Sequence, residues 1–107
     1  MDVETKAMQI ARRLWPEHDA KIVVRNVRSG HAEYESRIVT IPLWAMLSKK
    51  PGYAAYYIAH ELAHLQVIER GHGPLFYKAF MSLCPKSYQY HELHYKPRNA
   101  KQAGISR

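Results

Sequence analysis

Two histidines stand four residues apart in the segment His60-Glu61-Leu62-Ala63-His64, and a glutamate directly follows the first. In an α-helix, residues at positions i and i+4 lie on one face, one turn apart, so both imidazoles can reach a single metal ion. Glu61 is rotated by about 100° from His60 around the helix. That position suits it to take a proton from a metal-bound water rather than to bind the metal. The spacing therefore predicts a catalytic metal site.

A catalytic zinc ion takes three protein ligands and leaves its fourth position to water, so a third donor is required. His72 lies eight residues after His64, between Gly71 and Gly73. Glycine lets the backbone turn sharply, which would bring this ring back toward the other two. Glu92 is the alternative, because some metallopeptidases take a glutamate from a later helix.

The expected site holds one Zn²⁺ ion. Its expected ligands are His60, His64 and His72, and its expected catalytic residue is Glu61. Glu69 is a poorer ligand, because a helical residue there would face about 140° away from His64. The oxyanion of a tetrahedral intermediate needs a further donor, for which the sequence offers Tyr77, Tyr88, Tyr90, His91 and Tyr95. We expect the remaining histidines, including His18, His31 and His94, to be ordinary surface or structural residues.

Elements that could position this site follow from periodicity and from glycine and proline. Apolar residues recur every three or four positions from Val3 to Trp15, which predicts a helix ended by Pro16. The β-branched segment 21–27 and the segments 32–35 and 37–41 predict two or three antiparallel strands. We expect the last strand, before Pro42, to be an exposed edge that could bind an extended substrate.

The HExxH motif falls inside a long apolar helix predicted from about Gly52 to Arg70, with Gly71 as the left-handed residue that ends it. Gly73-Pro74 opens a further helix, which ends before Cys84-Pro85. The aromatic segment 87–95 fits no single element. Residues 96–107 carry basic side chains and almost no apolar ones, which predicts a flexible tail.

A chain of 107 residues, of which 47% are hydrophobic and 23% charged, is sufficient for one packed domain and too short for two. The single Cys84 excludes an internal disulfide and a four-cysteine zinc ribbon. No apolar run approaches the roughly 20 residues that span a bilayer, and no signal segment begins the chain. These features predict a cytoplasmic protein without membrane contact, and they indicate no oligomeric state.

The motif resembles the metallopeptidase core of SprT-like proteins, the group that includes the Spartan DNA–protein crosslink proteases. In that family an HExxH helix is followed by a GHGxxF segment, matched here by Gly71-His72-Gly73 and then Phe76. The resemblance covers about residues 21–83. It implies that the three histidines named above bind zinc and that Glu61 is the catalytic acid and base. The stretch between His64 and His72 is shorter than in Spartan-type members, as in small stand-alone bacterial and phage relatives.

We therefore expect an α+β, minimal zincin-like fold with a metallopeptidase domain over residues 1–95 and a basic tail over 96–107. It would consist of an N-terminal helix, a small antiparallel sheet, the HExxH helix and one or two further helices. The predicted activity is zinc-dependent hydrolysis of peptide bonds in a protein or peptide substrate, with Glu61 activating a zinc-bound water.

Two other functions stay open. A zinc-stabilised binding module would need a fourth ligand such as Glu92 or His94. A DNA-associated protease would use the net charge of +7 and the basic residues of the tail to contact nucleic acid. Those tail residues are Lys96, Arg98, Lys101 and Arg107.

Overall fold

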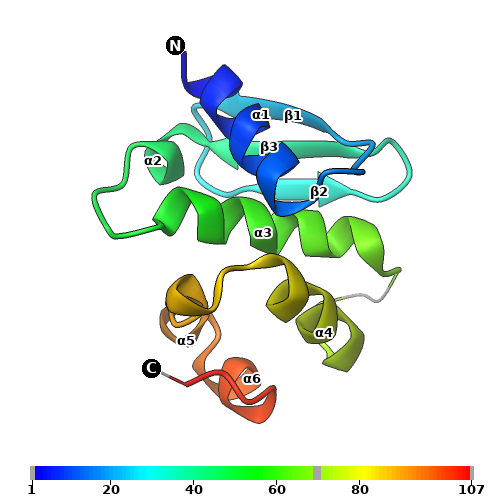
Figure 1. The fold of residues 1–107 in the computed structure, drawn as a ribbon, viewed down its shortest axis with the longest axis vertical. Helices are drawn as coiled ribbons and strands as arrows, with labels where there is room; N and C mark the ends of the chain where they lie inside the picture. Colours follow the sequence, from blue (N-terminus) through cyan, green and yellow to red (C-terminus); the bar gives the residue numbers. More distant parts are fainter. Residues whose placement is uncertain (1, 69–70, 107) are drawn as a thin grey trace.

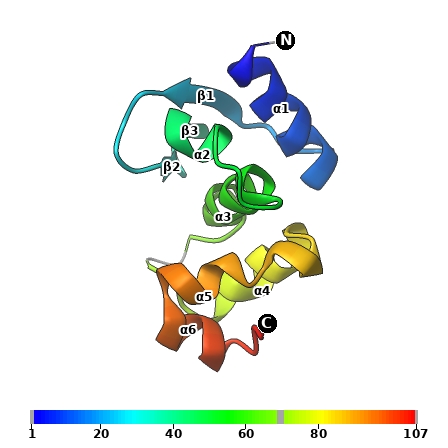
Figure 2. The ribbon, with the colours of Figure 1, turned by 90° about the vertical axis from the view of Figure 1, so that its left-hand side faces the viewer.

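A single long helix, α3, separates the two halves of the molecule in the computed structural model, which describes residues 2–68 and 71–106 (Figure 1). The N-terminal helix and the sheet lie on one side of α3, and the C-terminal helices lie on the other (Figure 2). In chain order the elements are α1 (Val3–Leu14), β1 (Lys21–Arg25), β2 (His31–Glu33), β3 (Ile38–Pro42), α2 (Leu43–Met46), α3 (Tyr53–Gln66), α4 (Pro74–Leu83), the 3₁₀ turn η1 (Lys86–Tyr88), α5 (His91–Tyr95) and α6 (Pro97–Gln102).

Helix α1 follows the predicted pattern closely. The Asp2 carboxylate caps it by accepting a hydrogen bond of 2.7 Å from the backbone N–H of Thr5. Ala7 and Ala11 are fully buried, and such small side chains let α1 approach its neighbours β1 and α3 closely. Glu4 accepts a hydrogen bond from the backbone N–H of Val24 in β1. The predicted helix is confirmed.

The sheet has three strands in the order β1-β3-β2 and is mixed rather than wholly antiparallel. β2 and β3 pair antiparallel, as predicted, because a short turn joins them. β1 runs parallel to β3, with Lys21 opposite Ile38. The last strand is therefore the central one, so the expectation that it forms an exposed edge was wrong. Val39 and Ile41 are fully buried, and this apolar strand gains more from two neighbours than from one.

Helix α3 carries the HExxH motif, as predicted, but ends at Gln66 rather than near Arg70. The Arg37 guanidinium donates a hydrogen bond of 3.0 Å to the Leu65 carbonyl, which satisfies one of the last carbonyls of the helix. Val67 is extended, as suits a β-branched residue. The predicted continuation to Arg70 falls partly outside the described residues.

The C-terminal half packs a second apolar core against the other side of α3. Helix α4 has the predicted bounds, and Cys84 is buried, also as predicted. Residues 97–102 form a helix, although the sequence predicted a flexible tail. The reason is that Ala100 is fully buried and Ile105 almost so, both in this second core. Two small or isolated apolar residues gave too weak a pattern to reveal the helix.

Across the described residues, no helix combines the length and the apolarity that a membrane span requires.

Candidate metal centre

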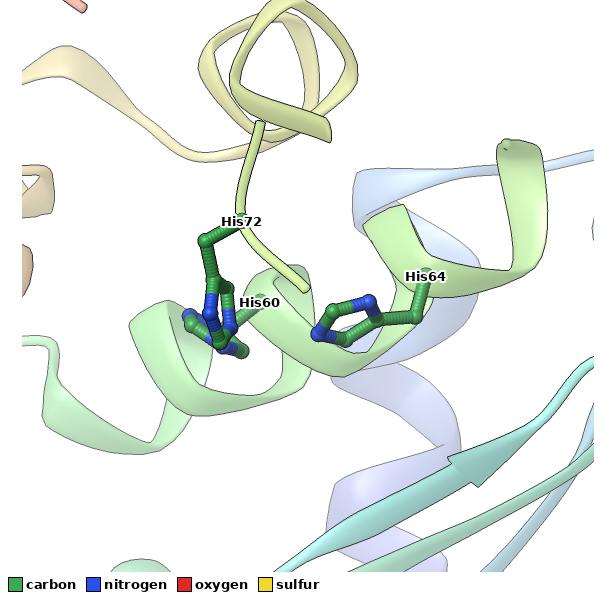
Figure 3. Close-up of side chains that lie close together, drawn as sticks. All are labelled: His60, His64 and His72. Carbon is green, nitrogen blue, oxygen red and sulfur yellow. The ribbon is translucent and has the colours of Figure 1, made fainter. Parts of the chain in front are cut away.

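Three imidazoles converge where α3 meets the segment that enters α4. One ring nitrogen from each of His60, His64 and His72 lies within 4.8 Å of the others. Figure 3 shows the rings of His60 and His72 together, with the ring of His64 directed toward them from the next turn of α3. The Nε2 atoms of His60 and His72 are 3.0 Å apart. A tetrahedral zinc ion holds two ligand nitrogens roughly 3.3 Å apart, given Zn–N distances of about 2.0–2.1 Å. The nitrogens of His60 and His72 therefore have nearly the spacing that such an ion requires, and the nitrogen of His64 lies within 4.8 Å of both.

The segment before α4 delivers the third ring. Gly71 has φ +76°, the left-handed conformation that the sequence predicted for it, although α3 has already ended. Pro74 occupies the first turn of α4, where its missing N–H costs nothing. The fully buried Phe76 packs beneath the cluster, with its ring centroid 4.4 Å from that of His64 and 4.8 Å from that of His72.

The surroundings favour the neutral form of His64 and His72, which is the form that binds a metal. Burial lowers the pKa of His64 to about 4, and the neighbouring His60 and His72 lower it further. Burial, followed by the charge of His60, lowers the pKa of His72 to about 4 as well. Both His64 and His72 consequently have a free imidazole lone pair at neutral pH.

Glu92 does not join the three ring nitrogens. Its carboxylate is fully buried and accepts hydrogen bonds from three side chains. The hydroxyls of Tyr56 and Tyr77 each donate a hydrogen bond of 2.6 Å to this carboxylate, and Nδ1 of His60 lies 2.9 Å from Oε1 of Glu92. The structure thus places this alternative ligand behind His60 rather than beside it.

This contact fixes the role of each nitrogen of His60. A carboxylate only accepts hydrogen bonds, so Nδ1 of His60 carries the proton and the Nε2 lone pair faces the cluster. Burial acts to raise the pKa of Glu92, but the hydrogen bonds from His60, Tyr56 and Tyr77 outweigh it. The pKa of Glu92 therefore lies below its usual value.

Glu61 lies beside the cluster and borders an open cleft of about 470 Å³. Only 7% of the residue is exposed. Burial raises the pKa of its carboxyl, and the charge of His60 offsets part of the effect. A raised pKa makes a carboxylate a better base near neutral pH. The edge strand β2 forms the opposite wall of the cleft through His31 and Ala32, and Figure 1 shows it as the strand nearest α3.

Comparison with known proteins agrees with this arrangement at the level of the fold. The structure is similar to that of abylysin, a metallopeptidase zymogen from Pyrococcus abyssi, with a TM-score of 0.62. The similarity covers 90% of this chain and 96% of that one, at 18% sequence identity. The chain has a metallopeptidase-like fold. No protein-family model and no curated protein matches the sequence.

Of the predicted oxyanion donors, Tyr90 and His91 lie together beside a different cavity, with ring centroids 4.2 Å apart. Tyr95 borders the cleft, and its ring centroid is 5.6 Å from that of His60. The Tyr77 hydroxyl is bound to Glu92, and Nε2 of His91 lies 2.8 Å from the Pro51 carbonyl. The ring of Tyr88 lies against Gly52 instead. Tyr95 is thus the best placed of the five candidates for an oxyanion.

The histidines predicted to be ordinary lie outside the cluster. His18 and His91 are buried, whereas His31 and His94 are exposed. His31 does border the cleft, from the β2 side. Glu69, the poorer alternative ligand, is outside the described residues.

The sequence did not reveal the hydroxyls of Tyr56 and Tyr77 as partners of Glu92. The one signal was that Glu92 lies within an aromatic segment. This did not show whether Glu92 binds the metal itself or supports a histidine that does.

Proposed function

We propose that this protein is a zinc-dependent metallopeptidase that hydrolyses peptide bonds, with Glu61 as general base and acid. The observation that carries the proposal is the convergence of His60, His64 and His72 next to a buried glutamate in an open cleft. The order of the motif residues also supports kinship with the SprT-like peptidases. A cytoplasmic location stays a prediction from the sequence.

The number of donors favours a catalytic site over a structural one. A structural zinc site is usually closed by four protein ligands. Among the residues that the structure describes, the candidate group contains three histidines and no further His, Cys, Asp or Glu. Glu92 is occupied by His60 and two tyrosines, and His94 is exposed on α5. The described residues therefore offer no fourth ligand of the kind that the zinc-stabilised binding module would need.

Bound zinc would supply a Lewis acid that lowers the pKa of a coordinated water and polarises a substrate carbonyl. Glu61 takes one proton from the attacking water, whose oxygen forms the new bond to the carbonyl carbon. Glu61 then gives that proton to the amide nitrogen as the C–N bond breaks. The Tyr95 hydroxyl, at the rim of the cleft, donates a hydrogen bond to the developing oxyanion.

An extended peptide would bind along β2 rather than along β3. β2 pairs with β3 on one side only, so its other edge offers unpaired backbone groups beside the cleft. A substrate that adds as a strand presents its carbonyls in the regular spacing that a protease requires.

The test is Glu61→Gln, compared with the wild type for zinc content and for cleavage of a fluorescence-quenched peptide mixture. The wild type should bind one zinc ion per chain and cleave. The variant should keep the zinc and lose turnover, because an amide cannot accept the proton. Cleavage by the variant at the wild-type rate would refute the role of Glu61, and a wild type that takes up no zinc would refute the proposal altogether.

A further inference from the structure

A second, smaller cavity opens beside the catalytic cleft and is lined mainly by aromatic rings. Its volume is about 110 Å³, and we call it the aromatic pocket. The rings that line it are Trp44, Tyr53, Tyr56, Tyr57 and Tyr95. The pocket and the cleft share Gly30, His60, Glu61 and Tyr95, so the two spaces adjoin at the glutamate.

The polar ends of three of these rings are already engaged. The Trp44 indole N–H donates to the Arg28 carbonyl at 3.0 Å. The Tyr57 hydroxyl accepts a hydrogen bond of 2.7 Å from the backbone N–H of Gly30. The Tyr56 hydroxyl is held by Glu92. What these side chains offer to an occupant is the apolar faces and edges of their rings.

The walls are also held in place by contacts among themselves. The ring of Trp44 meets that of Tyr57 edge-on at 5.6 Å and lies 6.0 Å from that of Tyr53. A Cβ atom at position 30 would collide with the Tyr57 ring, so Gly30 allows the loop between β1 and β2 to pack directly on it. The pocket is consequently formed by fixed neighbours rather than by free side chains.

From this we infer that the aromatic pocket is a specificity subsite that takes one apolar side chain, of about the size of Leu, adjacent to the scissile bond. The inference rests on the proposed peptidase function. A peptide added to β2 would turn alternate side chains toward the protein, and the pocket lies where one of them would pass Glu61. An engineered apolar cavity of about 150 Å³ holds benzene, so this smaller pocket of about 110 Å³ matches one aliphatic side chain such as Leu. Arg28 is among the residues that line the pocket, and its charge disfavours a cationic side chain.

The first experiment profiles cleavage. Zinc-loaded wild-type protein digests a mixture of proteome-derived peptides, and mass spectrometry identifies the new ends. We expect Leu or Met to be enriched at one position that flanks the cut. A flat profile, or enrichment of Lys or Arg at that position, would overturn the inference.

The second experiment locates the preference in the pocket. Trp44→Ala should reduce the ratio of kcat/KM for a Leu peptide to that for the matching Ala peptide by about tenfold, because one wall is lost. Leu47→Ala is the matched control, since Leu47 is also an exposed apolar residue next to α2 but is not among the residues that line the pocket. An unchanged ratio in Trp44→Ala, or an equal fall in both variants, would overturn the assignment.

A binding measurement separates this inference from the proposed function. Zinc-loaded Glu61→Gln protein is titrated into two labelled ten-residue peptides of Ser and Thr, one with a central Leu and one with a central Ala, and fluorescence anisotropy is followed. The Leu peptide should bind about tenfold more tightly, and Trp44→Ala should remove the difference. A Leu preference in binding without cleavage by the wild type would refute the peptidase and keep the pocket. Cleavage by the wild type, together with equal binding of the Leu and Ala peptides, would keep the peptidase and refute the pocket.

Discussion

The Glu92 carboxylate organises the cluster without belonging to it. It orients the His60 ring, and the hydroxyls of Tyr56 and Tyr77 hold the carboxylate itself. Partners of this kind set the tautomer of a ligand and raise its basicity. This interpretation differs from the alternative in which Glu92 is the third ligand, and the two predict different effects of substitution.

Glu92→Gln should weaken zinc binding by about 10- to 100-fold while the three histidines still bind. His72→Ala should weaken it much further, because a ligand is lost. Chelator competition measures both, with Glu33→Gln, which changes an exposed carboxylate, as the control. If His72→Ala left zinc affinity unchanged and Glu92→Gln abolished it, Glu92 would be the ligand after all.

Tyr95 should contribute to turnover and not to metal binding. Tyr95→Phe removes the hydroxyl but keeps the ring, and loss of one oxyanion donor typically lowers kcat by about 10²- to 10³-fold. We expect a fall in that range with unchanged zinc affinity. Tyr88→Phe is the control, because that ring lies against Gly52 away from the cleft. Equal activity of Tyr95→Phe and the wild type would assign the oxyanion to another donor.

The convergence of the three histidines was predictable from the sequence because its main part is local. His60 and His64 share a helical face whatever the tertiary structure, and flanking glycines indicated that His72 could return to them. The position of Glu92 was not predictable, because it depends on how α5 packs against α3. No spacing along the chain encodes that packing.

In the sheet too, the pairing of strands close in the sequence was predictable and the pairing of distant strands was not. The short turn between β2 and β3 determined their antiparallel pairing, and the sequence was sufficient for it. Alternating apolar residues reveal which face of a strand is buried but not which strand lies beside it or in which direction. The parallel contact between β1 and β3, and with it the identity of the edge beside the cleft, therefore required the structure.

The segment after α3 should be sensitive at Gly71. No described residue lies within 4 Å of the place where its Cβ would stand, so Gly71→Ala adds only the strain of a left-handed backbone at φ +76°. That strain costs about 1–2 kcal/mol of folding stability. If the backbone relaxes to relieve it, His72 shifts, and a loss of about 1.4 kcal/mol in binding corresponds to a tenfold lower zinc affinity.

Gly104→Ala is a matched control, because Gly104 has φ +91° and is equally free of described neighbours. Urea unfolding should show similar losses of stability in both variants. Chelator competition should show lower zinc affinity in Gly71→Ala alone. Unaltered zinc binding in Gly71→Ala would mean that the conformation of this glycine does not position His72.

The net charge of +7 belongs to the molecule rather than to any one site. Arg98 and Lys101 are exposed on α6, whereas Arg107 lies outside the described residues. Contact with nucleic acid through this surface stays a prediction. It would show as DNA binding that weakens steeply with salt, and the DNA-associated protease would additionally require that DNA raises the rate of cleavage.

Acid should destabilise the fold partly through His18, a buried residue of which only 6% is exposed. Its Nδ1 accepts a hydrogen bond of 3.0 Å from the backbone N–H of Ala20, and its Nε2 has no partner among the described residues. Burial lowers the pKa of His18, and the charge of Arg12 lowers it further, against the opposing charge of Asp19. Protonation of Nδ1 would also replace the acceptor of the Ala20 N–H by a second donor, so that hydrogen bond would be lost.

The direction of the pH effect follows from that lowered pKa. In the unfolded chain His18 takes up a proton near pH 6.5, whereas the folded protein resists it until a lower pH. The unfolded state then binds more protons, so the free energy of unfolding falls as the pH drops below about 6.5, until the folded-state pKa is reached.

His18→Asn keeps an acceptor for Ala20 but cannot titrate. Between pH 7 and pH 5 it should lose less stability than the wild type in urea unfolding. His31→Asn, at an exposed histidine, should follow the wild type. Parallel curves for His18→Asn and the wild type would show that His18 is not a source of the acid sensitivity.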